Sequence, residues 1–127
     1  MAGSFEVQWL AGGILLLRRS GLFTLDEARA YVTTAEKELA KTPARWGALV
    51  DLRQAIAQTD EVQDLVQGLV RKVAAKQPLR MAVVTTSTIT TIQERRITIG
   101  PGLHDAATTD FYDDYDTALQ AMRKAVM

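Results

Sequence analysis

Residues 5–17 read Phe-Glu-Val-Gln-Trp-Leu-Ala-Gly-Gly-Ile-Leu-Leu-Leu, and this stretch decides how the fold begins. Its first half alternates apolar and polar residues, as expected of a strand that buries one face. The glycines at 12 and 13 can adopt the backbone angles of a tight turn, and the four apolar residues 14–17 fit a more deeply buried strand. The sequence therefore predicts an antiparallel hairpin that ends at Arg18 and Arg19.

The segment after the hairpin carries the start and stop signals of a helix. Thr24 and Glu27 form a capping box, in which a hydroxyl and a carboxylate accept hydrogen bonds from backbone amides at the helix start. Pro43 ends the segment, because proline cannot continue a helix. Apolar residues recur between these signals at intervals of three and four, which predicts a helix with one face on a sheet: Leu25, Ala28, Val32, Ala35 and Leu39.

Two further apolar runs predict strands inside a parallel sheet. Residues 46–52 are apolar at nearly every position up to Asp51, as expected of a strand covered on both faces. A loop is predicted over 53–58, and residues 79–86 form a third buried strand. Trp9 and Trp46 both fall in strand patterns, so we expect both rings to fill core space.

A second helix is expected between these runs. Thr59 or Asp60 can cap its start, and Pro78 marks its exit. Its apolar stripe is continuous: Val62, Leu65, Val66, Leu69 and Val73.

The last third of the chain is harder to assign. Residues 87–99 are rich in β-branched side chains, which favour a strand, yet their isoleucines fall at helical spacing, and we predict a helix. The Gly-Pro-Gly sequence at 100–102 supplies a stop. A short strand over 108–112 and a final helix capped by Asp116 complete the chain.

The predicted order is ββαβαβαβα. Alternation of strands and helices, with right-handed crossovers, gives an α/β fold with a mixed, mostly parallel sheet, an N-terminal antiparallel hairpin and helices packed on it. At 127 residues the chain predicts one domain over residues 1–127.

Composition excludes several classes of function. Fifteen basic and fifteen acidic residues cancel, which argues against nucleic-acid binding. The chain has no cysteine, so disulfides and thiolate chemistry are excluded, in keeping with a reducing compartment. The longest apolar run, residues 14–17, is far shorter than a membrane span, and residues 1–6 do not resemble a signal peptide. We expect a cytoplasmic protein.

In order and content, the chain resembles the STAS domain of anti-sigma-factor antagonists, and especially its SpoIIAA-like branch, which includes SEC14-type lipid-binding proteins. The resemblance covers most of the chain. It implies a non-catalytic module that binds another protein. The stretches that carry it are the opening hairpin, Gly-Leu-Phe-Thr at 21–24, Ala-Leu-Val-Asp-Leu-Arg at 48–53, Arg-Met-Ala-Val-Val at 80–84, Asp-Phe-Tyr-Asp at 110–113 and Ala-Leu at 118–119.

One family feature is missing. Antagonists are switched by phosphorylation of a serine at the start of the helix that follows the strand ending in Asp, within an Asp-Ser-Ser-Gly pattern. The matching residues 54–60 read Gln-Ala-Ile-Ala-Gln-Thr-Asp, so that cycle does not carry over. Thr59 is the one hydroxyl near this helix start, and it has two readings: a helix cap, or a phosphorylation site that Asp60 and Glu61 would disfavour.

A ligand site is predicted where strands end. In open parallel sheets, ligands bind beyond the carboxyl ends of the strands. These ends would deliver Asp51 and Arg53 from one strand, and Thr85 and Ser87 from the next. The alternative is a threonine-rich helix cap at 85–88, since the sequence has no nucleotide-binding fingerprint.

No catalytic, metal or cofactor site is predicted. His104 is the only histidine and has no nucleophile motif beside it, so a role in loop packing is favoured over that of a general base. Four aspartates at 110, 113, 114 and 116 lack the glycine and closing glutamate of a calcium loop, and a solvated turn with a helix cap is favoured.

The sequence thus predicts a non-enzymatic STAS-like module whose partner is another protein or a second copy in a homodimer. A carrier of a small apolar or lipid-like ligand is the alternative, and it needs a pocket of roughly 300 Å³ or more.

Overall fold

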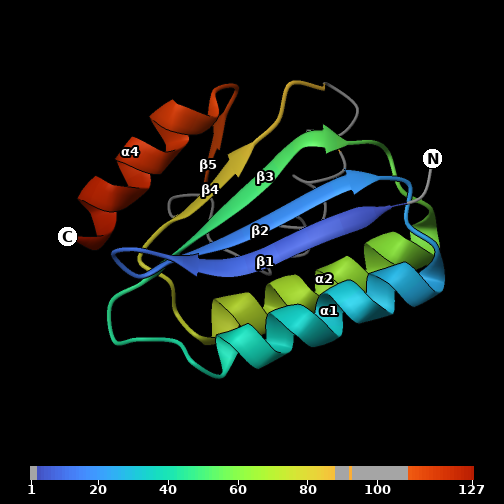
Figure 1. Cartoon of the computed structure of the whole chain (residues 1–127), viewed down its shortest axis with the longest axis horizontal. Coiled ribbons are helices and arrows are strands. Elements are labelled where there is room, and N and C mark those ends of the chain that lie inside the picture. The colour runs from blue at the N-terminus through green and yellow to red at the C-terminus, as the bar shows by residue number, and fades with distance from the viewer. Residues whose placement is uncertain (1–2, 88–91, 93–108) are drawn as a thin grey trace.

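The computed structural model describes residues 3–87, 92 and 109–127. Its centre is a five-stranded sheet in the order β1-β2-β3-β4-β5 (Figure 1). The first two strands are antiparallel, and β2–β3, β3–β4 and β4–β5 are parallel. The predicted mixed, mostly parallel sheet with an opening hairpin is confirmed. The strands are β1 (Ser4–Leu10), β2 (Ile14–Gly21), β3 (Gly47–Ala55), β4 (Met81–Val84) and β5 (Thr109–Tyr112).

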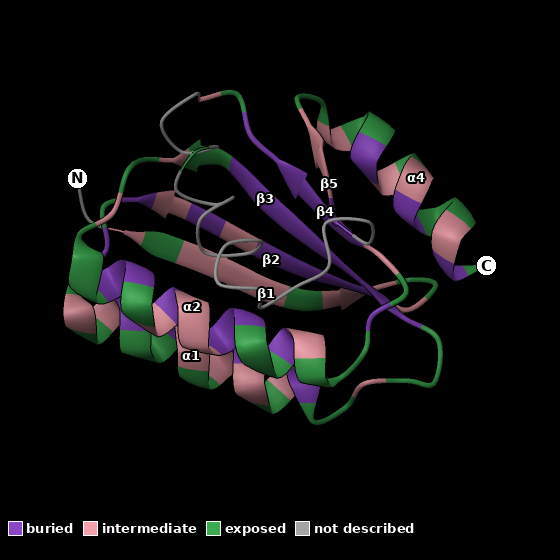
Figure 2. Cartoon of the chain, turned by 180° about the vertical axis from the view of Figure 1, so that it is seen from behind, coloured by how far each residue is buried: buried purple, intermediate pink, exposed green. Residues whose placement is uncertain are grey.

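Helices cover both faces of the sheet. The helices α1 (Leu25–Leu39) and α2 (Asp60–Ala75) lie side by side on one face, and α4 (Tyr115–Val126) lies on the other (Figures 1 and 2). The central strands β2, β3 and β4 therefore send alternate side chains into two separate apolar clusters.

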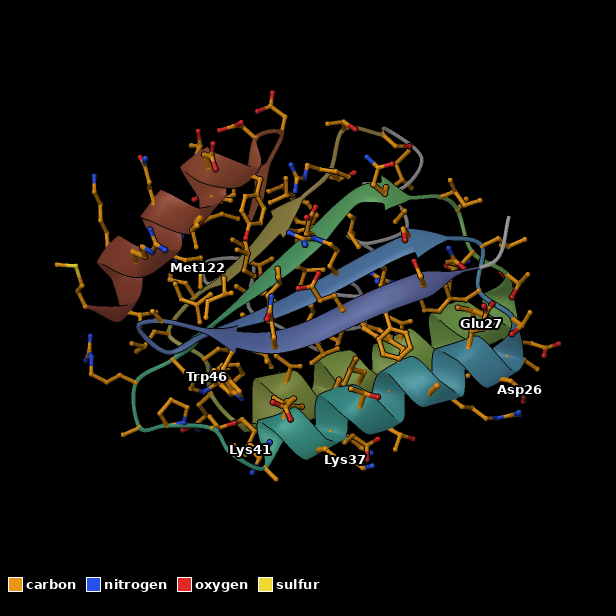
Figure 3. The ribbon with its side chains drawn as sticks, in the orientation of Figure 1. Asp26, Glu27, Lys37, Lys41, Trp46 and Met122 are labelled. Carbon is orange, nitrogen blue, oxygen red and sulfur yellow. The ribbon has the colours of Figure 1, made fainter. Side chains whose placement is uncertain are left out.

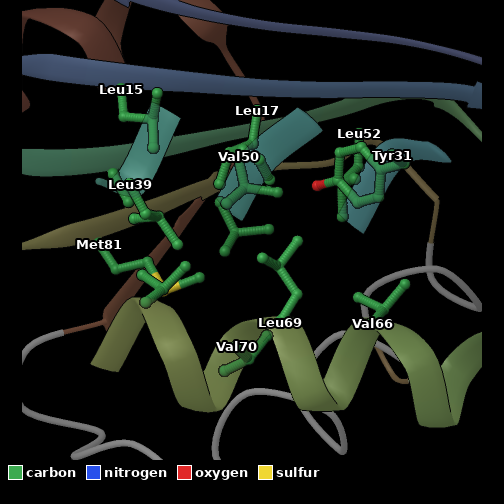
Figure 4. Packing of buried hydrophobic residues seen from close by; sticks show 14 of the residues in the cluster. Leu15, Leu17, Tyr31, Leu39, Val50, Leu52, Val66, Leu69, Val70 and Met81 are labelled. Carbon is green, nitrogen blue, oxygen red and sulfur yellow. The ribbon is translucent and has the colours of Figure 1, made fainter. Parts of the chain in front are cut away.

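The larger cluster fills the space under α1 and α2. Figure 4 shows Val66 and Leu69 of α2 pointing toward strand residues such as Val50. The smaller cluster lies under α4 and contains Ile14, Leu16, Leu49, Ala82, Val84, Ala118, Met122 and Val126. No helix among the described residues is long and apolar enough to cross a membrane.

The predicted turn and capping signals are largely confirmed. Gly12 and Gly13 have φ angles of 89° and 80°, which only glycine adopts without strain. The capping box of Thr24 and Glu27 is present at the start of α1. The hydroxyl of Thr59 accepts a hydrogen bond from the amide of Val62 at 3.4 Å and caps α2.

The cap of the last helix was predicted wrongly. Asp114, rather than Asp116, precedes α4, and its carboxylate accepts from the amide of Thr117 at 2.9 Å. Asp116 lies in the first turn of the helix. Both aspartates suit the positive end of a helix, so composition alone did not separate them.

Strand lengths also differ from the prediction. The predicted loop over 53–58 is wrong for its first three residues, because β3 continues to Ala55. It does so because β2 also runs on to Gly21, and these strand ends pair with each other. In contrast, β4 is shorter than the predicted 79–86. The predicted helix over 87–99, the stop at 100–102 and His104 lie outside the described residues.

The two tryptophans bind the carboxyl-terminal ends of α1 and α2. The indole nitrogen of Trp46 donates to the carbonyl of Lys76 at 2.9 Å, and that of Trp9 donates to the carbonyl of Glu38 at 3.1 Å. Trp46 is fully buried, as predicted, whereas Trp9 at the sheet edge is only half-buried. Both rings pack together, with centroids 5.8 Å apart.

Candidate functional site

The carboxyl ends of β2, β3, β4 and β5 meet at one edge of the sheet, because these strands run parallel. The four residues predicted to bind a ligand are placed near this edge, as two pairs. Asp51 and Arg53 belong to β3, while Thr85 and Ser87 follow β4.

Asp51 is buried at 2% exposure, and guanidinium and amide groups surround its carboxylate. Arg53 donates to its Oδ1 and Oδ2 at 3.0 and 2.8 Å, and the amide of Arg53 donates to Oδ1 at 3.1 Å. Arg18 on β2 donates to Oδ2 at 2.7 Å. Burial would raise the pKa of Asp51, but the hydrogen bonds from Arg53 and Arg18 outweigh it and hold the pKa below its ordinary value.

The pair is part of a longer charged network on the α4 face of the sheet. Arg18 also binds Glu6 on β1 at 2.9 Å. The guanidinium groups of Arg18 and Arg53 lie 5.5 and 4.6 Å from the ring centroid of Tyr115, the first residue of α4. This network therefore connects three strands to the start of a helix.

Thr85 and Ser87 form a local turn. The hydroxyl of Thr85 lies 3.3 Å from both the amide and the carbonyl oxygen of Ser87. Thr85 is buried, and it lines a hollow of about 420 Å³ together with Phe111, Tyr112 and Asp113.

Asp51 and Thr85 point to opposite faces of the sheet. Asp51 shares the α4 face with Leu49, as does Val84 of the neighbouring strand. Because side chains alternate along a strand, Thr85 follows Val84 toward the other face. Sequence reasoning placed all four residues at one corner and missed Glu6, Arg18 and Tyr115, whose part in the network depends on strand register.

A second feature of this edge is an apolar surface made by Leu22 and Ile56. Each follows directly on the last paired residues of β2 and β3, Gly21 and Ala55, so the two lie on neighbouring loops. Their exposures are 43% and 50%, which is high for large apolar side chains. We call them the Leu22–Ile56 surface.

Gln58 holds the two loops of this surface together. Its Oε1 accepts from the amide of Phe23 at 2.9 Å, and its Nε2 donates to the carbonyls of Gly21 at 2.9 Å and Ile56 at 2.8 Å. One side chain thus satisfies backbone groups on both loops. The exposed apolar pair is fixed by hydrogen bonds rather than left on free loops.

The helix start beside this surface is acidic. Asp60 and Glu61 open α2 and are exposed, as is Thr59 before them. Thr59 is thus an exposed residue as well as a helix cap, and its phosphorylation stays a prediction.

Two of the four aspartates over 110–116 are engaged in structural contacts. Asp110 is paired with Arg80, and Asp114 caps α4. In the described part of the chain, no three His, Asp or Glu side chains are grouped closely enough to hold a metal ion.

Comparison with known proteins identifies the fold. No family model matches the sequence, and no curated protein matches it. Among solved structures, an anti-sigma factor antagonist from Mycobacterium paratuberculosis is 20% identical, with a TM-score of 0.66, over 95% of this chain and 94% of that chain. An uncharacterised protein of the DUF3478 family with a SpoIIAA-like fold, from Shewanella loihica PV-4, is 17% identical with a TM-score of 0.67 over the same shares. Neither is described as SEC14-type. The chain has the SpoIIAA-like fold.

Proposed function

We propose that this protein is a non-catalytic, STAS-like regulatory module of the cytoplasm, which binds a partner protein through the Leu22–Ile56 surface. The fold supports the STAS-like assignment, since one similar structure is an anti-sigma factor antagonist. The observation that carries the proposal is the Gln58 clamp, which bonds the backbone on both sides of Leu22 and the carbonyl of Ile56, the two residues whose apolar side chains are exposed. A surface ordered in advance loses less entropy on association.

The state of Asp51 supports a non-catalytic role. A general acid or base needs a proton-accepting atom within reach of a substrate and a pKa near the working pH. Asp51 is buried, its oxygens accept from two arginines, and its pKa is lowered further from neutrality. It suits a structural ion network better than proton transfer.

Affinity capture from the native host tests the proposal with matched variants. Ile56→Asp places a charge in the surface, and Leu79→Asp makes the same change at a residue of similar exposure, 38%, at the opposite end of the sheet. We expect a partner that the wild type and Leu79→Asp retain and Ile56→Asp loses. Titration with the purified partner should show at least a tenfold weaker affinity for Ile56→Asp. Equal binding by all three proteins would contradict the proposal.

The hollow beside Thr85 favours a second candidate function, the binding of a small ligand. Its volume of about 420 Å³ suits a small molecule, and both polar and aromatic residues line it: Thr85, Phe111, Tyr112 and Asp113. Native mass spectrometry of the protein purified from its host is the test. A bound small molecule whose occupancy falls in Thr85→Val would support this function, and protein free of ligand would oppose it.

A further inference from the structure

The charged side chains in the first and last turns of the helices differ in sign between the two ends of the molecule, although the net charge is zero. The three helices α1, α2 and α4 each begin after a strand at the carboxyl edge of the sheet. Acidic side chains are favourable at helix starts and basic ones at helix ends. Figure 3 shows this along α1, with Asp26 and Glu27 at one end and Lys37 and Lys41 at the other.

The other helices repeat the pattern. The first turns of α2 and α4 are acidic and their last turns are basic. We call the carboxyl edge of the sheet the acidic end and the opposite edge the basic end. The acidic end holds Asp26, Glu27, Asp60, Glu61 and Asp116, together with the arginine Arg53. The basic end holds Lys37, Lys41, Lys72, Lys76, Arg123 and Lys124, and two glutamates there, Glu38 and Glu36, pair with Lys41 and Lys72.

The basic end also contains an apolar hollow. It lies between the last turns of α1 and α2 and has a volume of about 370 Å³. Leu39, Ala40 and Ala75 line it, together with the charged residues Glu36, Lys72 and Lys76. Lys72 is 56% exposed and pairs with Glu36 at 2.6 Å, so its charge lies at the rim rather than under the surface.

The acidic end carries features that match this hollow. The Leu22–Ile56 surface projects apolar side chains there, and Asp60 and Glu61 are exposed only a few residues after Ile56. The two ends thus differ in shape and in the sign of charge, with an apolar patch at each. A hollow of this size can take either of the two projecting side chains.

We propose that copies of this chain associate head to tail, with the Leu22–Ile56 surface of one copy seated in the hollow between α1 and α2 of the next. Asp60 and Glu61 of the first copy then face Lys72 and Lys76 of the second. Because the joined surfaces are different, each copy keeps one free end, and the contact repeats into a chain instead of closing as a two-fold dimer.

Charge favours a second copy over a lipid surface. An anionic membrane would attract the basic end, but it would leave the acidic end and its apolar pair unused. The proposal shares the Leu22–Ile56 surface with the proposed function. Self-association would therefore cover the surface at which a partner binds.

Sedimentation velocity at low and high salt is the first test. Surface charges interact over about 30 Å at 10 mM ionic strength and about 3 Å at 1 M. The average mass of the wild type should rise with protein concentration at low salt and fall to that of a monomer at high salt. A wild type that stays monomeric at low salt overturns the proposal, as does a monomer that instead binds phosphatidylserine vesicles through its lysines.

Variants in which only one of the two contact surfaces is disabled test whether the contact is head to tail. Ile56→Asp disables the acidic end, and the double change Lys72→Glu with Lys76→Glu disables the basic end. Each variant alone should be monomeric, whereas their equimolar mixture should form dimers and nothing larger. Lys124→Glu, a basic residue on α4 away from the hollow, is the control and should associate like the wild type. A mixture that stays monomeric, or blocked variants that associate normally, would refute head-to-tail contact.

Self-association and partner binding can be tested separately. The double lysine variant leaves the Leu22–Ile56 surface intact, so it should lose self-association and still bind the captured partner. A reciprocal charge exchange shows that loss of association is not caused by misfolding. The variant Asp60→Lys with Glu61→Lys should be monomeric alone. Mixed with the double lysine variant it should form long chains, because opposite charges then face each other at every contact. Absence of that rescue counts against the proposed pairing.

Discussion

At the scale of single residues, Asp51 is a buried charge that the structure stabilises with two arginines. Its carboxylate is removed from water, which is costly, and the cost is offset by hydrogen bonds from Arg18 and Arg53. Both guanidinium groups remain partly exposed, at 33% and 41%, so they can rehydrate if the carboxylate is lost. The carboxylate is therefore the member of the network whose removal should cost most.

Asp51→Asn should lower the free energy of unfolding by about 2–3 kcal/mol at pH 7. Because the folded state lowers the pKa of Asp51, its stabilisation is present above the unfolded pKa of about 3.9 and is lost as pH falls through the folded pKa. Urea unfolding at pH 7 and pH 3 should show a smaller difference between wild type and variant at pH 3. The exposed Asp113→Asn is the control. A difference that is equal at both pH values would exclude ionisation of Asp51 as the cause.

Thr59 allows a second prediction at this scale. Thr59→Ala removes a helix cap and should cost about 1 kcal/mol in thermal or urea unfolding, while Thr59→Ser should cost much less. If Thr59 is also phosphorylated, intact-mass analysis of wild type purified from its host should show one added phosphate that Thr59→Ala lacks. Unmodified wild-type protein would leave the residue with its capping role alone.

At the scale of elements, the sequence predicted correctly those features that depend on residues close together in the chain. The capping box of α1, the glycine turn between β1 and β2 and the apolar stripes of α1 and α2 all depend on residues close in sequence. The end of β3 was mispredicted because polar residues there pair with the end of β2, more than thirty residues earlier. The network around Asp51 depends on the same register, so the pattern of residues gave Asp51 and Arg53 but neither Arg18 nor Tyr115.

The loops after β2 and β3 act as one unit through Gln58, and removing its side chain should separate them. Gln58→Ala leaves the amide of Phe23 and the carbonyl of Gly21 without this partner, and it should cost about 1–3 kcal/mol. Hydrogen exchange should quicken at Phe23, whose amide loses its acceptor. Gln54→Ala, at an exposed position of β3, should change stability by less than about 0.5 kcal/mol. Unchanged exchange at Phe23 would argue against the clamp.

At the scale of the whole molecule, both apolar clusters depend on the same central strands. β2, β3 and β4 send side chains into each cluster, so neither layer of helices can separate without exposing strands that the other needs. Both tryptophans belong to the α1–α2 side, whereas α4 contributes to helical circular dichroism. Tryptophan fluorescence and far-ultraviolet circular dichroism should therefore give coincident urea transitions. An earlier loss of circular dichroism would show that α4 detaches first.

Strand β1 begins at one end of the fold and helix α4 ends at the other, as Figure 1 shows. Ser4 begins β1 beside the end of β2 at Ser20, and Met127 follows the last turn of α4 at the basic end. A flexible linker from Met127 to the start of a second copy would thus present the basic end of one unit to the acidic end of the next. A single polypeptide made of several such copies would therefore be a polymer in which every unit has the same direction. Its length would be set by the number of copies encoded.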